Sequence, residues 1–291
     1  MTFLAVLVGI AVLYFTGVFR NPLPGSEVPK PAPTVMKKLP SRVSESPPVM
    51  MEHTSARLPP RIISQKHVDN RQGTIAIIID DMGSSMREAE TLLAMNTPLT
   101  ISIIPGLAKA KAVAEEVHRK GGEVMIHIPM EPKDYQQKPF EKNGLLLSMS
   151  DKEIQERMEG YLEGVPNAVG ANNHMGSRFT EDRSRMAVVL AVLKRKGFFF
   201  VDSKTSPQSL GDSLAREMGI PAAARSVFLD NVQEVGAIKS QVDKLAGIAR
   251  KNGSAIGICH PHKTTLIVLS TTLPELKNKG IRFVKVSELV R

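Results

Sequence analysis

Apolar and polar positions alternate in blocks along the chain from residue 74 onward, and the blocks are of two kinds. Short, nearly continuous apolar runs such as 75–79 predict buried strands, whereas longer stretches with apolar residues three or four apart predict helices. Strands are expected at 75–80, 99–104, 123–128, 168–172, 198–202, 224–230, 254–259 and 281–286. Helices are expected at 107–120, 151–163, 208–218, 236–251 and 264–278, with two more that begin near Ser84 and Thr180.

Strands and helices that alternate in this way predict an α/β fold with a parallel sheet. Seven or eight βα units between residues 74 and 291 favour a (β/α) barrel, distorted or incomplete, with a doubly wound open sheet as the alternative. Ser84 or Ser85 suits the N-cap of one helix, and Thr180 suits that of another running to about residue 196. Ser150 and Glu153 form a capping box. The irregular segment 129–149 is expected to shape a groove over the site.

Five of the expected strands end at side chains that bind metals or move protons. In alternating β/α architectures the carboxyl ends of the strands share one rim, and that rim holds the active site. We therefore expect these side chains to converge on one pocket of a metal-assisted enzyme. They are Asp80-Asp81, His127, Asn172-Asn173-His174, Asp202 and His260-Pro261-His262.

The two acids at the first strand end, Asp80 and Asp81, are adjacent in sequence. Neighbours in a regular strand point to opposite sides, so both serve one site only if the backbone turns there. Gly83 supplies that freedom because glycine tolerates positive φ. One carboxylate can then ligate a cation while the other stays free as a base. The structural alternative is a turn in which both acids cap the next helix.

Histidines are concentrated at the same places. Residues 74–291 contain five, of which His118 falls within an expected helix, where we expect it to be solvated, and the other four follow expected strands. Imidazoles together with a carboxylate form a normal ligand set for zinc and related divalent ions. Three protein ligands plus water is the open arrangement of catalytic sites, and Asp81, His127 and His174 would supply it.

Cys259 is the single cysteine and lies beside His260. A Cys-His nucleophile is one interpretation of this pair. Alternation along a strand puts neighbours on opposite faces, so if His260 faces the pocket, Cys259 packs against a helix. We therefore expect a structural cysteine.

The net charge of +9 is spread unevenly over the chain. Residues 20–73 hold nine Lys or Arg against four Asp or Glu, whereas 74–291 hold twenty-nine against twenty-five. There is no Trp and there are only three Tyr, so a platform for stacking bases is poorly supplied. We expect no nucleic-acid partner.

The N-terminal part of the chain has a different character. Residues 3–19 carry no charge, and their seventeen-residue length is at the short end of a membrane span. They fit a signal segment or, because no small-x-small cleavage site follows, a membrane anchor. Residues 20–73 contain ten of the twenty prolines and predict a disordered linker, which leaves 74–291 as the catalytic domain. Arg20 alone would place the C-terminal side in the cytoplasm by the positive-inside rule.

In order along the chain, five motifs resemble those of the divergent polysaccharide deacetylases, distant relatives of the NodB-type carbohydrate esterases. They are Ile77–Gly83, Met125–Pro132, Asn172–Ser177, Phe200–Thr205 and Gly257–Pro261. The resemblance covers nearly all of 74–291. It implies a distorted (β/α) barrel and a divalent-metal enzyme, most simply a zinc enzyme, that removes acetyl groups from glycans. It also favours export, with the domain on the periplasmic or extracytoplasmic side of the membrane.

The resemblance also implies a role for individual residues. Asp80 matches the catalytic base of the paired-aspartate motif, and Asp81 matches its metal ligand. His127 matches the first histidine of a His-x-x-x-His motif. Glu131 stands where the second is expected, so either Glu131 ligates the metal or His174 takes over; we favour His174.

The remaining motifs supply the other candidates. His260 matches the general acid, and Asp202 matches an acid that we expect to orient His260 or another imidazole. Arg178 is the one residue that stands in for an Arg-x-Pro motif. Further candidates for contact with the substrate or with the ligands are Asn172, Asn173, Ser177 and His262. The structural alternative is that the Asn-rich loop bonds its own backbone.

Two other functions are compatible with these residues. Because the second histidine of His-x-x-x-His is missing, the domain would also fit an inactive glycan-binding or scaffolding module of the cell envelope. A glycosidase would pair Asp80 with Glu131 or Asp202, but it has no use for several histidines. The sequence names neither the sugar nor a protein partner.

Overall fold

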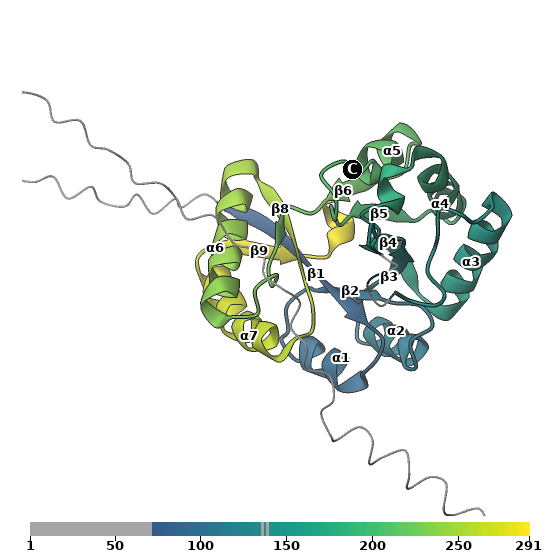
Figure 1. Ribbon diagram of the computed structural model, residues 1–291. Helices are drawn as coiled ribbons and strands as arrows, with labels where there is room; N and C mark the ends of the chain where they lie inside the picture. The colour runs from purple at the N-terminus through teal and green to yellow at the C-terminus, as the bar shows by residue number, and fades with distance from the viewer. Residues whose placement is uncertain (1–71, 135–136, 138–139) are drawn as a thin grey trace, which may run out of the picture. The chain divides into compact units, whose positions relative to one another are not determined.

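The computed structural model describes residues 72–134, 137 and 140–291. The expected membrane segment at 3–19 and nearly all of the expected linker at 20–73 lie outside these residues, so both stay predictions. Among the described residues, no helix is long and apolar enough to cross a bilayer. The described part holds the expected α/β domain, with helices arranged around a curled sheet (Figure 1).

Nine strands of the described part form one sheet in which every pairing is parallel. Strand β1 shows why, because its run Ile75–Ile79 is buried on both faces, as a parallel strand requires. The strands are β1 (Gly73–Met82), β2 (Thr100–Ile103), β3 (Glu123–Met130), β4 (Ala168–Met175), β5 (Phe199–Asp202), β6 (Ala222–Ala224), β7 (Val227–Phe228), β8 (Ser254–Cys259) and β9 (Ile281–Val284).

The strands lie in the order β6-β5-β4-β3-β2-β1-β8-β7, and β9 also pairs with β1. Strand β8 pairs along one edge of β1. The other edge is shared, because β9 pairs with the first half of β1 and β2 with the second half. All carboxyl ends therefore point to the same rim, as a barrel of βα units requires.

The segment that contains β6 and β7 joins the two ends of the sheet. Strand β6 pairs with β5, whereas β7, which follows two residues later, pairs with β8. The N–H of Arg225 donates to Asp202, and the next N–H, that of Ser226, donates to Ile256 in β8. The sheet thus curls into a distorted (β/α) barrel of NodB type rather than an open doubly wound sheet. The single strand expected at 224–230 is wrong in detail, because the chain changes partner there and forms two short strands.

The structure confirms most of the expected helix caps. Ser85, not Ser84, caps the first helix, and Ser150 with Glu153 forms the expected capping box. Thr180 is not an N-cap: it lies in a short 3₁₀ turn, and Asp182 caps the helix that follows. The helices are α1 (Met86–Leu93), α2 (Ala110–Arg119), α3 (Asp151–Gly164), α4 (Arg183–Arg195), α5 (Gly211–Glu217), α6 (Val235–Asn252) and α7 (Lys263–Asn278), with 3₁₀ turns η1 (Phe179–Glu181) and η2 (Val286–Glu288).

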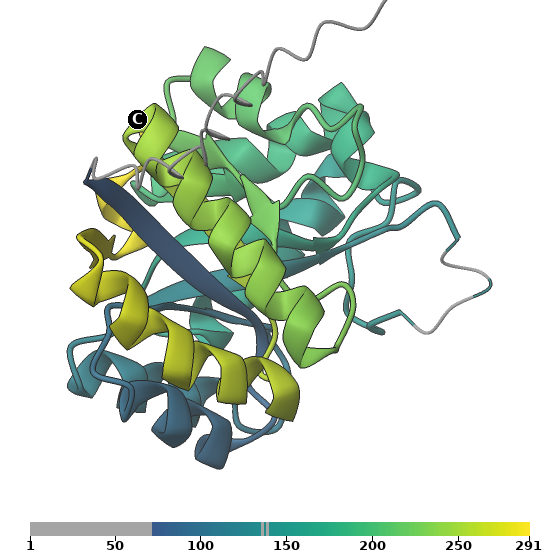
Figure 2. The ribbon, with the colours of Figure 1, turned by 90° about the vertical axis from the view of Figure 1, so that its left-hand side faces the viewer.

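The core has two layers, and the two faces of β1 divide between them. Along β1, Ile75, Ile77 and Ile79 pack in the larger layer under the helices, whereas Ala76 and Ile78 pack in a small cluster inside the barrel. Figure 2 shows α6 and α7 lying along the outer side of β1. Cys259 is fully buried in the outer layer, so the expectation of a structural cysteine is confirmed.

Candidate metal centre

The end of strand β1 is distorted, and the distortion directs both Asp80 and Asp81 toward β3. The pairing of β1 with β2 shifts register between Ile79 and Met82, and Asp81 has a φ of 58°, in the left-handed region. Non-glycine residues in this region are strained and cluster at functional sites. As a result, an oxygen of Asp80 lies 3.5 Å from Nε2 of His127, and an oxygen of Asp81 lies 3.2 Å from the same nitrogen.

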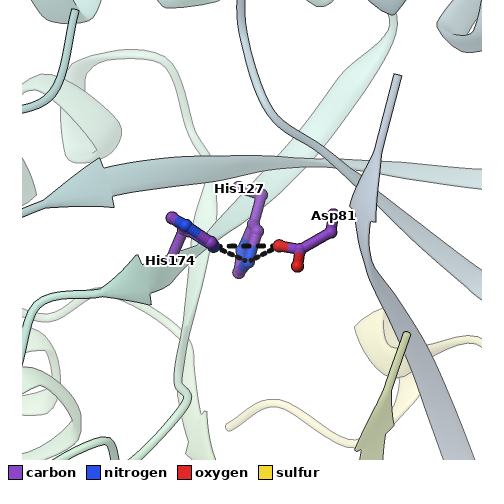
Figure 3. A group of neighbouring side chains, drawn as sticks. All are labelled: Asp81, His127 and His174. Atoms are coloured by element: carbon purple, nitrogen blue, oxygen red, sulfur yellow. Dashed lines mark hydrogen bonds and ion pairs between the residues drawn. The ribbon is translucent and has the colours of Figure 1, made fainter. Parts of the chain in front are cut away.

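Three of the expected residues form a compact triad, which we call the first centre: Asp81, His127 and His174. Oδ1 of Asp81 lies 3.2 Å from Nε2 of His127 and 2.9 Å from Nδ1 of His174. The two ring nitrogens are 3.1 Å apart. Figure 3 shows the three side chains, from three different strands, pointing toward one another.

This geometry fits a divalent cation. Ligand atoms about 2.1 Å from a tetrahedral zinc lie about 3.4 Å from one another, close to all three separations in the first centre. One carboxylate with two imidazoles leaves a fourth position open, as in catalytic zinc sites. The first centre therefore has the donor atoms and the spacing that the sequence predicts.

The charges of the first centre are tightly coupled. Burial alone would raise the pKa of Asp81, but the two imidazoles outweigh it and hold this pKa far below its usual range. Burial alone would lower the pKa of His174, yet Asp81 and Glu141 raise it to about 10. In the metal-free protein His174 thus carries a proton at neutral pH, and a cation binding there displaces that proton.

Asn172 links the first centre to the neighbouring acid. Its Oδ1 accepts hydrogen bonds from Ser102 (2.6 Å) and from Nδ1 of His127 (2.8 Å). Its Nδ2 donates to Asp80 (2.9 Å) and to Ser203 (3.3 Å). Because Oδ1 can only accept, Nδ1 of His127 carries the proton, and Nε2 keeps its lone pair for a cation. Asn172 is fully buried and engaged within the protein, so the expected contact with a sugar hydroxyl is wrong for it.

Glu141 is a residue of the site that the sequence does not single out. It belongs to the segment between β3 and α3, and its Oε1 lies 3.3 Å from Nε2 of His174. Nδ1 of His174 faces Asp81, so the imidazole lies between two carboxylates. A carboxylate on the far nitrogen fixes the ring orientation and raises the basicity of a ligating histidine.

Asp80 is placed to act as a base beside the first centre. Its side chain is buried, and one of its oxygens accepts the hydrogen bond from Asn172. Burial raises the pKa of Asp80 above the usual aspartate range, although His127 and the bond from Asn172 oppose this. A raised pKa makes the carboxylate a stronger proton acceptor at neutral pH.

His260 lies on the other side of Asp81, with Nε2 3.6 Å from Oδ2 of that residue. Its Nδ1 lies 3.2 Å from Oδ1 of Asp230, whose other oxygen accepts hydrogen bonds from the N–H of His260 and the hydroxyl of Thr265. Burial alone would lower the pKa of His260, but the bond to Asp230 and the charge of Asp81 raise it. His260 therefore holds its proton more firmly than a free imidazole does, with Nε2 directed toward the first centre.

The carboxylate that orients His260 is thus Asp230, and the role expected for Asp202 is wrong. Asp202 lies at the end of β5 as predicted, but its oxygens accept hydrogen bonds from the N–H of Lys204, the hydroxyl of Ser209 and the N–H of Asp212. Its charge is met by Nζ of Lys204 at 3.3 Å. Asp202 holds together the loop after β5.

Glu131 and Arg178 pair with each other instead of joining the first centre. Oε1 of Glu131 accepts from Arg178 at 2.7 Å, and Oε2 accepts from the N–H of Leu147 at 2.7 Å. Of the two alternatives for the third ligand, His174 is therefore the one that lies beside Asp81. Arg178 pairs with Glu131, and its expected part as the counterpart of the Arg-x-Pro motif stays a prediction.

The other expected contacts are local. Asn173 donates to the carbonyl of Met175 and accepts from the N–H of Ser203, which matches the alternative that the Asn-rich loop bonds backbone. Ser177 accepts from the N–H of Lys133. His262 lies close to Asp230 and His260.

Comparison with known proteins agrees with this geometry. Residues 77–290 match the family model of the divergent polysaccharide deacetylases. The protein YibQ of Escherichia coli K12 is 37% identical over 218 residues, which cover 75% of this chain and 67% of YibQ. A protein of Haemophilus influenzae Rd is 36% identical over 205 residues, which cover 70% of this chain and 72% of that protein. The crystal structure of ATU2773 from Agrobacterium tumefaciens C58 matches with a TM-score of 0.72 and 27% identity, over 76% of this chain and 90% of that one.

The chain belongs to the divergent polysaccharide deacetylase family. Its barrel has the carbohydrate-esterase type of fold that the resemblance implied. Candidate metal ligands lie on the rim where that fold carries its chemistry.

Proposed function

We propose that the domain is a metal-dependent deacetylase that hydrolyses acetyl groups on a cell-envelope glycan. The observation that supports this most directly is the first centre, with its base candidate Asp80 on one side and the acid candidate His260 on the other. Amide or ester hydrolysis needs a base for the attacking water and an acid for the leaving group, and Asp80 and His260 are the residues proposed for these two roles.

The cation is proposed to be zinc, held by Asp81, His127 and His174. One oxygen and two imidazole nitrogens suit zinc better than magnesium or calcium, which prefer oxygen ligands. When bound, such an ion polarises the acetyl carbonyl and lowers the pKa of a coordinated water.

Asp80 takes the proton of the attacking water. Asn172 holds one of its oxygens, and the other faces His127 at 3.5 Å, so the carboxylate is fixed beside the reacting group. The raised pKa of Asp80 suits a carboxylate that must accept a proton.

His260 donates the proton that the departing amine or alcohol needs. Asp230 holds Nδ1, so the acidic hydrogen is on Nε2, which faces the first centre. As the bond between the acetyl carbon and the leaving group breaks, the proton passes from Nε2 to that group. Acetate is released, and solvent restores the proton to His260 and removes the one on Asp80.

The cellular setting is part of the same proposal. Residues 3–19 would hold the protein in the membrane, and residues 20–73 would link them to the domain on the periplasmic or extracytoplasmic side. The partner is then an acetylated glycan of the envelope, and no nucleic acid is involved.

The test is acetate release by the full-length protein from N-acetylglucosamine oligomers and from peptidoglycan fragments. Protein stripped with a chelator is compared with protein given one equivalent of zinc. We expect release only with zinc, and a loss of at least about 100-fold in Asp80→Asn, the usual contribution of a general base. Saccharide binding without release under zinc, cobalt or manganese would instead favour the inactive glycan-binding module.

A further inference from the structure

A second group of ligand atoms lies next to the first centre; two of its three residues serve the proposed reaction, but the three have no role yet as a group. A carboxylate oxygen of Asp230 and one ring nitrogen each from His260 and His262 all lie within 4.8 Å of one another. We call these three residues the second centre. Among them, Oδ1 of Asp230 and Nδ1 of His260 are 3.2 Å apart, and the two imidazole rings are 5.6 Å apart between centroids.

The second centre repeats the chemistry of the first. One carboxylate and two imidazoles are again the ligands that zinc prefers, and 3.2 Å is close to the separation of about 3.4 Å between ligands of a tetrahedral ion. All three ligand atoms lie within 4.8 Å of one another, so the longest separation exceeds the tetrahedral value by at most about 1.4 Å. A rotation of the His262 side chain, on the loop between β8 and α7, is enough to close such a gap.

The two centres touch through one contact, because Nε2 of His260 lies 3.6 Å from Oδ2 of Asp81. A cation in the second centre therefore binds close to the charge of a cation in the first. Repulsion between like charges at short range weakens the later binding event. The second centre is expected to fill only after the first.

We propose that Asp230, His260 and His262 form a second, weaker zinc site, and that its occupation inhibits the enzyme. The inhibitory part rests on the proposed function, whereas the binding part does not. A cation on Nδ1 of His260 replaces the proton that faces Asp230. With Nδ1 held by the cation instead of Asp230, His260 no longer serves as the proton donor of the proposed reaction.

The binding part is tested by titrating the metal-free, full-length protein with zinc and counting equivalents by calorimetry. The wild type is expected to take a tight and a weaker equivalent. His262→Ala should keep the tight equivalent and weaken the other more than 100-fold, since loss of an outer partner alone costs about 10–100-fold. His118→Ala, which removes an exposed histidine on α2, should match the wild type. A single equivalent in the wild type, or two unchanged equivalents in His262→Ala, overturns the second site.

The inhibitory part is tested with acetate release as zinc is increased. In the wild type the rate should rise with the first equivalent and fall at least about tenfold with the second. In His262→Ala and in the more conservative His262→Gln, the rate should reach a plateau and stay there. A fall of the same size in these variants contradicts inhibition through the second centre. If no zinc concentration gives acetate release, the proposed function fails, but the calorimetric count still decides whether the second site exists.

Discussion

Replacing Asn172 with alanine tests how the first centre is held in place. The substitution removes four hydrogen bonds from a fully buried amide: two accepted by Oδ1 and two donated by Nδ2. At about 1 kcal/mol for each bond, the free energy of unfolding should fall by about 4 kcal/mol, less whatever water in the new space recovers. In addition, Nδ1 of His127 loses the acceptor that fixes its tautomer. Zinc affinity should therefore fall by about 10–100-fold.

Asn173 provides the matched control, because it is the next residue and is also buried. It makes three hydrogen bonds, to Met175, Thr205 and Ser203, and contacts no residue of the first centre through them. Asn173→Ala should lower the free energy of unfolding by about 3 kcal/mol. Its zinc affinity should stay close to that of the wild type.

Asn172→Asp separates the two links that Asn172 makes. The aspartate keeps an acceptor for Nδ1 of His127, so zinc affinity should change less than in the alanine variant. It cannot donate to Asp80, and two carboxylates then face each other at about 2.9 Å. Like charges this close raise the pKa of the carboxyl pair that includes Asp80. The acid limb of the kcat/KM profile should therefore shift to higher pH by about one pH unit or more.

The assays are urea denaturation for stability and competition with a chromophoric chelator for zinc, both on the full-length protein. If Asn172→Ala binds zinc as tightly as the wild type, the proposed support of His127 is refuted. Equal losses of affinity in Asn172→Ala and Asn173→Ala would also refute it, because a general loss of stability would then explain both.

Other substitutions follow from the same contacts. His174→Ala should weaken zinc binding by more than 100-fold, measured by chelator competition, because it removes a ligand rather than an outer partner; an unchanged affinity would exclude His174 as a ligand. Glu141→Gln should weaken it by about 10-fold by removing the carboxylate at Nε2 of His174, and no change would mean that this contact does not support the ligand. Glu131→Gln should leave zinc affinity unchanged while lowering the free energy of unfolding by about 1–3 kcal/mol, since it removes the charge that pairs with Arg178 and leaves one acceptor oxygen for the two donors that Glu131 meets. A loss of zinc binding would restore Glu131 as a ligand. Zinc affinity should rise roughly tenfold per pH unit between pH 7 and 9, because His174, with its pKa of about 10, must lose its proton before it binds the ion. Calorimetry in buffers of different ionisation enthalpy measures this proton release. Zinc binding without proton release would contradict the prediction.

The strand-end pattern predicted the first centre because parallel strands in a barrel carry their carboxyl ends to one rim. Asp81, His127 and His174 come from β1, β3 and β4, far apart in sequence, and still meet. The same pattern was present at Asp230, which follows Leu229 at the end of the strand expected at 224–230. Even so, the pattern does not single out Asp230, because Arg225 interrupts the apolar run where the chain changes its pairing from β5 to β8.

Contacts that do not follow from the position of a strand end have no comparable signal in the sequence. Glu141 lies in a segment without periodicity, and its approach to His174 depends on how that segment folds over the rim. Asp202 follows a strand as predicted, but its carboxylate turns back to the N–H of Lys204 two residues later, a local bond that aspartate often makes. Strand position therefore predicts which residues reach the rim, whereas the direction of a short side chain depends on the donors beside it.

The central claim is that Asp81, His127 and His174 bind one divalent cation. It is tested most directly by X-ray diffraction at the zinc absorption edge from crystals grown with one equivalent of zinc. The account predicts a single anomalous peak about 2.1 Å from Oδ1 of Asp81, Nε2 of His127 and Nδ1 of His174. Zinc located elsewhere in the domain, with these three atoms unligated, would contradict it.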